Sequence, residues 1–185
     1  MFMNYKKIIL NSSLVAVVIL SIVSCTNKKS PTDSLNAITE KVMGSNEGVF
    51  RGLNLGDNLN KVQKNETVQT LEADSAYLYY EYFLDDSIGS YNLTYNFDEK
   101  GLFEIQSSIF INDANQTETV LNQFKTYFDK FYGASVSERG FNIWSVKSEK
   151  FGQIKINLRD ESANFTIKGA PGKLSLWIYK EEANS

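Results

Sequence analysis

The fold is decided by the stretch SYNLTYNFDEKGLFEIQSSIFIN, residues 90–112. Its first half places an aromatic or aliphatic residue at every second position, the pattern of a strand with one buried face. A turn over residues 98–101 follows, in which Gly101 can adopt the positive φ of a hairpin. The second half repeats the alternation. The apolar sets are Tyr91, Leu93, Tyr95 and Phe97, then Phe103, Ile105, Ile109 and Ile111.

A helix and one further strand precede this hairpin. Asp57 is a suitable N-cap residue for a helix over residues 58–66, in which Leu59 and Val62 form one apolar stripe. An aromatic-rich strand is expected over residues 76–84. Residues 47–112 are therefore predicted to form a unit of one helix and three antiparallel strands.

A second unit of the same kind is predicted over residues 113–185. Its helix begins at Asp113, with Gln116 at the capping-box spacing, and ends at Tyr132 before Gly133. The apolar stripe of this helix is Val120, Phe124, Phe128 and Phe131. Strands are expected over residues 141–146, 152–159 and 174–180. Two helix-plus-three-strand repeats predict an α+β fold, with one antiparallel sheet, both helices on one face and the other face open.

Residues 1–24 have the composition of a bacterial signal peptide. Lys6 and Lys7 precede an apolar segment, as in sequences that direct export. The uninterrupted core of that segment, residues 14–20, is much shorter than the roughly 20 residues that a membrane-spanning helix needs. Removal of the signal leaves a chain long enough for one compact domain or two small repeats.

Residues 21–25, Ser-Ile-Val-Ser-Cys, resemble the lipobox of bacterial lipoproteins. The resemblance implies cleavage between Ser24 and Cys25 and acyl chains on Cys25, and two or more such chains hold a protein stably at a bilayer. The alternative is an ordinary secretory signal in which the cysteine stands by chance. Cys25 is the only cysteine of the chain, so the exported part is expected to fold without an intramolecular disulfide.

Residues 25–46 are predicted to form the lipidated cysteine and a flexible tether, because they are mostly polar. About twenty flexible residues span on the order of 25 Å. A short helix at the end of the tether stays open, since Leu35, Ile38 and Val42 have helical spacing. The two lysines after the cysteine differ from acidic surface-export signals, which favours an outer-membrane location facing the periplasm.

Composition argues against several classes of function. The formal net charge is -3, which disfavours nucleic-acid binding, and the chain has no histidine, which removes the commonest general base and zinc ligand. The carboxylate pairs at residues 85–86, 98–99 and 160–161 fall at predicted turns, where Asp is favoured for local hydrogen bonding. No catalytic residue, metal or cofactor is expected, and the protein is not expected to be an enzyme.

Two motifs resemble a known family. Residues 52–62, GLNLGDNLNKV, are similar to the helix start of small bacterial lipoproteins related to the outer-membrane assembly lipoprotein BamE (SmpA/OmlA type) and to β-lactamase inhibitor protein. Residues 95–102 resemble the hairpin that follows in those proteins. The resemblance implies a tandem helix-and-strand domain, protein binding through the exposed sheet face or loops, and a role in envelope assembly.

A binding face is predicted on the open side of the sheet. Helices on one side of a sheet cannot cover both faces of its aromatic-rich strands, and exposed aromatic surface is typical of protein recognition. The residues concerned are Tyr77, Tyr79, Trp177 and Tyr179. The alternative is that loops or the tether cover these rings. The expected partners are the membrane and another envelope protein. The alternative function is capture of a small hydrophobic ligand or lipid in a pocket between sheet and helices.

Overall fold

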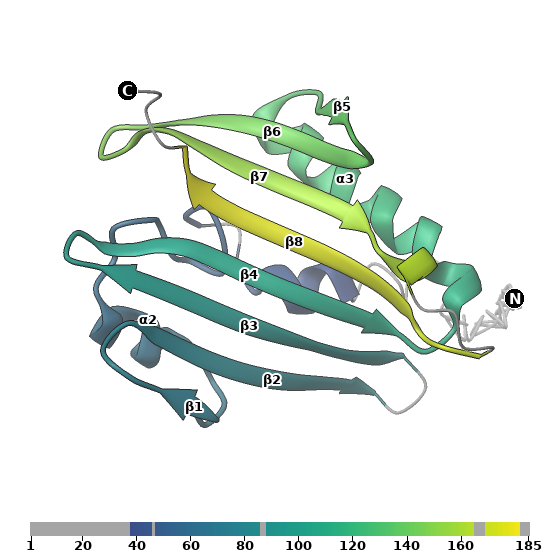
Figure 1. The fold of residues 1–185 in the computed structure, drawn as a ribbon, viewed down its shortest axis with the longest axis horizontal. Helices are drawn as coiled ribbons and strands as arrows, with labels where there is room; N and C mark the ends of the chain where they lie inside the picture. The colour runs from purple at the N-terminus through teal and green to yellow at the C-terminus, as the bar shows by residue number, and fades with distance from the viewer. Residues whose placement is uncertain (1–37, 46, 86–87, 165–168, 182–185) are drawn as a thin grey trace, which may run out of the picture.

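The computed structural model describes residues 38–45, 47–85, 88–164 and 169–181. The strands are β1 (Glu72–Ala73), β2 (Tyr77–Asp85), β3 (Gly89–Asp98), β4 (Gly101–Ile111), β5 (Val136–Glu138), β6 (Phe141–Ser148), β7 (Gly152–Asp160) and β8 (Gly172–Lys180). They form one sheet in the order β1-β2-β3-β4-β8-β7-β6-β5, and every neighbouring pair is antiparallel. The two halves of the chain therefore meet where β4 pairs with β8, in the middle of the sheet (Figure 1).

The expected fold class, α+β with two helix-plus-three-strand repeats, is wrong. The structure is one eight-stranded antiparallel sheet with few helices, and each half of the chain contributes four strands rather than three. The additional strands, β1 and β5, have two and three residues, all of them exposed. Strands this short carry no apolar alternation, so a period-two pattern cannot reveal them.

The β3–β4 hairpin confirms the expected alternation except at Phe103, which is only half-buried. Leu102 is completely buried in its place, because the register of the hairpin shifts between Asn96 and Phe97. Leu93 and Tyr95 are completely buried, and Tyr95 pairs with Ile105 across the hairpin. Gly101 has a φ of 103°, and an added Cβ would lie 2.7 Å from the backbone oxygens of Gly56 and Asp57. Only glycine fits here, because residues 56–57, before the helix over residues 59–65, pass directly over the turn.

Helix α3 (Thr117–Tyr132) lies across β6, β7 and β8, on the far side of the sheet in Figure 1. Val120, Phe124 and Phe128 are completely buried beneath it, and the Phe128 ring lies 5.1 Å from the Trp144 ring. Phe131 was expected in the same stripe but is 44% exposed. The α-helix begins later than expected, because Asp113 caps a 3₁₀ turn, η1 (Ala114–Gln116), rather than α3 itself.

Helix α2 (Leu59–Asn65) is short, and its N-cap is Asn58 rather than Asp57. The Asn58 side chain accepts a hydrogen bond from the backbone N–H of Lys61 at 2.9 Å. Asp57 instead accepts from the backbone N–H of Asn54 at 2.8 Å and closes the preceding turn. The expected N-cap, Asp57, was therefore wrong by one position.

Residues 38–43 are helical and pack against the core side of the sheet, although they fall within the segment expected to be a tether. Ile38, Val42 and Met43 are almost completely buried. The short helix that the spacing of Ile38 and Val42 left open is thus present in the described part. A flexible tether would end before residue 38.

Candidate binding surface

The open face of the sheet carries all four aromatic residues expected there. Register places Tyr79, Thr94, Gln106 and Trp177 in one row across β2, β3, β4 and β8. Trp177 is 37% exposed, and Tyr79 is half-buried. Between the two aromatic rings lie two polar side chains.

A second row runs beside the first. It contains Tyr77, Asn96, Glu104 and Tyr179, again with the aromatic residues on β2 and β8. Three strand spacings, about 14 Å, separate the two tyrosines. The four predicted residues thus share a face but form two separate aromatic pairs, divided by a polar strip on β3 and β4.

The β2 pair is bound to carboxylates. Tyr77 Oη donates to Glu72 at 3.0 Å, and Tyr79 Oη donates to Glu81 at 2.8 Å. The hydrogen bond to Glu72 raises the pKa of Tyr77, and burial together with Glu81 raises the pKa of Tyr79. Both hydroxyls therefore stay protonated over the physiological range and hold the glutamates in place.

The β8 pair belongs to a larger cluster over β6, β7 and β8. The Trp177 ring stacks on the Phe141 ring with 5.9 Å between centroids, and the Arg159 guanidinium lies over the Phe141 ring, 4.7 Å from its centroid. Asn157 lies on β7, the middle strand of the three, and donates a hydrogen bond to Tyr179 Oη at 3.1 Å. Asn157 Oδ1 is buried and has no hydrogen-bond partner among the described residues. A buried acceptor without a donor is costly, so Asn157 is a strained position within this cluster.

Sequence reasoning missed Phe141, Asn157 and Arg159 as members of this surface. All three lie on β6 and β7, and their contact with Trp177 depends on the strand order β8-β7-β6. Alternation within each strand places each residue on the open face. The order of the strands, which a single sequence does not reveal, decides that they meet.

The described carboxylates of the predicted pairs lie at ends of strands and in turns, while Asp86 lies outside the described residues. Asp98 forms an ion pair with Lys180, and the hydrogen bond from Lys180 lowers the pKa of Asp98. Glu161 lies 2.9 Å from the Lys173 ammonium and also contacts Arg159. Among residues 38–45, 47–85, 88–164 and 169–181, no three Asp, Glu or Cys side chains gather where they could hold a metal ion. The predicted cleavage and lipidation residues, Ser24 and Cys25, lie outside the described residues.

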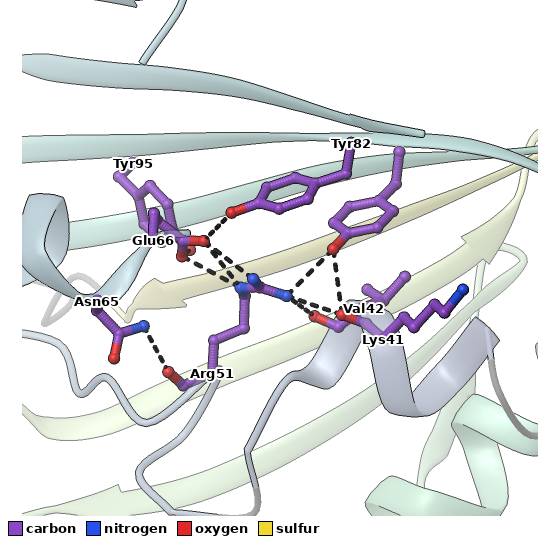
Figure 2. A network of polar contacts seen from close by, with 8 residues as sticks. Lys41, Val42, Arg51, Asn65, Glu66, Tyr82 and Tyr95 are labelled. Atoms are coloured by element: carbon purple, nitrogen blue, oxygen red, sulfur yellow. Dashed lines mark hydrogen bonds and ion pairs between the residues drawn. The ribbon is translucent and has the colours of Figure 1, made fainter. Parts of the chain in front are cut away.

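A buried polar cluster on the opposite, core side of the sheet was not expected. Arg51 and Glu66 form an ion pair with an Nη2 to Oε2 distance of 2.9 Å, and their side chains are 8% and 0% exposed. Glu66 also accepts hydrogen bonds from the hydroxyls of Tyr82 and Tyr95 (Figure 2). Each oxygen of the buried carboxylate therefore has more than one donor, which offsets the cost of removing its charge from water.

The same cluster fixes the helical segment 38–43 to the sheet. Arg51 Nη1 donates to the backbone oxygens of Lys41 and Val42, at 2.8 and 3.0 Å (Figure 2). Tyr91 Oη donates to the Lys41 oxygen at 3.1 Å. These are carbonyl groups at the end of a helix, where a positive charge is favourable. The cluster is enclosed by the protein, so we assign it a structural role.

A groove of about 570 Å³ lies between segment 38–43 and α3. Its lining includes Thr39 and Gln123, and the buried atoms Thr39 Oγ1 and Gln123 Oε1 have no hydrogen-bond partner in the described part of the chain. The groove runs between two helices, so it differs in place from the pocket expected between sheet and helices.

No protein family, curated protein or solved structure matches this chain. No helix within the described residues is both long and apolar enough to cross a membrane.

Proposed function

We propose that this protein is a lipid-anchored lipoprotein of the cell envelope that binds another protein through the open face of its sheet, without catalysis. The anchor is Cys25, and the location is the outer membrane, facing the periplasm. The observation that carries the binding function is the cluster of Trp177, Phe141 and Asn157. It places exposed aromatic surface beside a polar side chain whose buried oxygen, Asn157 Oδ1, has no partner within the described residues.

The shape of this surface favours a protein over a small molecule. Aromatic rings on a rigid sheet offer contact area at little entropic cost, and they are enriched at the centres of protein interfaces. The polar strip of β3 and β4 would supply hydrogen bonds beside the rings. Small ligands instead favour concave sites that enclose most of their surface.

Crosslinking in intact cells tests this function. Proteins crosslinked to the wild type are compared with those crosslinked to Trp177→Ala, which removes the exposed ring of the cluster. Phe131→Ala is a matched control, because Phe131 is a similarly exposed aromatic on α3, away from the open face. We expect at least one protein to be lost with Trp177→Ala and kept with Phe131→Ala. An unchanged set of partners, or no crosslinked protein at all, would contradict the proposal.

The second candidate function is capture of a small hydrophobic ligand or lipid. The observation in its favour is the groove beside Thr39 and Gln123, with its two unpartnered oxygens. Thr126 is exposed and lines the groove, so Thr126→Trp should fill it. Native mass spectrometry of the detergent-purified protein would then show a bound small molecule on the wild type and none on Thr126→Trp.

A further inference from the structure

Within the part of the chain that the structure describes, the outer edge of β2 is largely uncovered. β1 pairs only with Leu78 and Tyr79, at the beginning of β2, and Figure 1 shows the rest of that edge without a neighbouring strand. The carbonyl oxygens of Tyr77 and Tyr79 accept hydrogen bonds from the β1 side. Backbone groups alternate in direction along a strand, so those of Glu81 and Phe83 point to the same, open side. An edge with free N–H and C=O groups is a template for another strand.

The side chains at this edge are aromatic and acidic. Phe83 is 84% exposed, and Leu71 beside β1 is 58% exposed. The sequence from residue 65 to residue 99 contains eight Asp or Glu residues and no Lys or Arg. Natural edges are usually protected by lysine or proline, as Lys147 does on the free part of β6 at the other side of the sheet. β2 carries neither lysine nor proline; its charged residues are Glu81 and Asp85, and a bulge follows Phe83.

A small slot on the open face adjoins the edge. Phe83 pairs with Ser90, and Ser90 pairs with Phe110, so two aromatic side chains flank one small residue across β2, β3 and β4. Neighbouring strands lie about 4.8 Å apart, so the two aromatic residues begin about 9.6 Å apart. A flat group stacked between two rings needs about 7 Å, with contacts of about 3.5 Å on each side.

The slot is closed at one end by Glu81 and Asn92, and its volume is about 90 Å³. That is far smaller than the roughly 300 Å³ or more of an ordinary ligand pocket, but it suits the end of one side chain. One Glu81 oxygen accepts from Tyr79, and Glu81 has no ion-pair partner in the described residues. Lys173, which follows Phe110 in the same row, is already neutralised by Glu161 at 2.9 Å.

We propose that an extended, basic segment of a partner protein pairs with the free edge of β2 and places an arginine or lysine side chain between Phe83 and Phe110, against Glu81. Main-chain hydrogen bonds to Glu81 and Phe83 would hold the segment, as in other cases of strand addition. An arginine fits best, because its planar guanidinium stacks on aromatic rings and also forms an ion pair with a carboxylate.

A second copy of this chain suits the edge poorly. Two β2 strands paired antiparallel about Phe83 would place Glu81 of each copy opposite Asp85 of the other. Like charges directly opposite each other destabilise a strand pair. A basic partner instead complements every carboxylate along this edge. The inference rests on the proposed function only in requiring that the partner is a protein.

The test uses the full-length chain in detergent and dye-labelled nine-residue peptides of alternating threonine and valine. The central residue of the peptide is arginine, lysine, glutamine or glutamate, and binding is measured by fluorescence polarisation. Protein variants are Glu81→Gln, Phe83→Ser and, as the matched control at the opposite edge, Val136→Ser, where Val136 is 66% exposed. Circular dichroism establishes that each variant is folded. Hydrogen exchange reports whether the amides of residues 81–83 become protected.

We expect the arginine peptide to bind at least about ten times more tightly than the glutamine peptide. Glu81→Gln should remove this preference, Phe83→Ser should weaken binding of all peptides, and Val136→Ser should change neither. Equal binding of arginine and glutamine peptides, a preference that survives Glu81→Gln, or no binding at about 1 mM peptide overturns the inference. If these peptides fail while a Trp177-dependent partner is found in cells, the inference alone is wrong. If no crosslinked protein is found in cells, the proposed function is wrong.

Discussion

Arg51 binds Glu66 inside the protein, fifteen residues along the chain, with a 2.9 Å contact between Nη2 and Oε2. Arg51 has a φ of 53°, in the left-handed region that side chains other than glycine and asparagine seldom adopt. The backbone oxygen of Arg51 is held by Asn65 at 2.7 Å, from the end of α2. The loop before α2 thus keeps an unfavourable backbone conformation in order to direct one guanidinium at a buried carboxylate.

The first prediction concerns this pair. Arg51→Met leaves Glu66 buried without its cation and removes the donors to Lys41 and Val42. We expect the free energy of unfolding to fall by about 3–5 kcal/mol, as when one partner of a buried ion pair is lost. Urea unfolding measures it. A double variant, Arg51→Met with Glu66→Gln, should recover part of the loss, because the neutral amide needs no cation.

Lys61→Met is the control for this prediction. Lys61 pairs with Asp57 at 2.9 Å, but its side chain is 51% exposed. A solvent-exposed pair contributes little, so we expect a change below about 1 kcal/mol. Similar losses for Lys61→Met and Arg51→Met would show that burial of the Arg51 pair has no special importance.

The second prediction concerns alkaline pH. Burial, together with the hydrogen bond to Glu66, raises the pKa of Tyr82 from 10.0 to about 12. Because the folded pKa lies above the unfolded one, the stabilisation is fully present below pH 10 and is lost as the pH rises toward 12. The unfolding free energy of the wild type should therefore fall between pH 10 and 12, and Tyr82→Phe should reduce this fall. Urea unfolding at several pH values measures the free energy of each protein, and tyrosinate absorbance measures the ionisation of tyrosine. An equal fall in the wild type and in Tyr82→Phe would contradict this prediction.

The third prediction concerns Gly172, where β8 meets the beginning of α3. An added Cβ would lie 1.8 Å from Thr117 Oγ1 and 3.0 Å from Thr117 Cβ. Gly172→Ala should lower the free energy of unfolding by about 1–3 kcal/mol, as overpacking usually does. Adding Thr117→Ala removes the closer atom, so the double variant should be more stable than Gly172→Ala. Thermal and urea unfolding decide between these outcomes.

The fourth prediction concerns the anchor. Cys25→Ala should abolish incorporation of labelled palmitate and stop normal signal cleavage, because the thiol is the group that takes up lipid. Metabolic labelling followed by gel electrophoresis measures both, and Ser34→Ala serves as a control that should label normally. Palmitate incorporation in Cys25→Ala would mean that this protein is not a lipoprotein of the expected kind.

Periodicity predicts the long strands well, because each position of β3 has an environment set by its own alternation. Leu93 and Tyr95 are completely buried, as expected. Periodicity cannot predict β1, because its two exposed residues, Glu72 and Ala73, show no apolar alternation. The expected fold class was wrong because strands of two or three residues leave no signal that exceeds that of an ordinary loop.

The binding surface is predictable in part for the same reason. Alternation predicts that Tyr79 and Trp177 lie on the same face of the sheet, and they do so in the structure. The contact of Trp177 with Phe141 depends on which strand follows β8 in the sheet, and Arg51 gives no sequence signal of burial at all. Contacts between residues far apart in the chain depend on the order of the strands in the sheet, and that order cannot be predicted from a single sequence.

The pairing of β4 with β8 has a consequence for the order of events during folding. β8 comes last in chain order among the described strands, yet it fills the centre of the sheet. Until residues 172–180 have been made, β4 and β7 each present a long unpaired edge, and such edges are prone to aggregate. Joining segments so distant in the chain is also slow. A chain interrupted before residue 172 would thus consist of two separate half-sheets with exposed, aggregation-prone edges, rather than a slightly shorter folded protein.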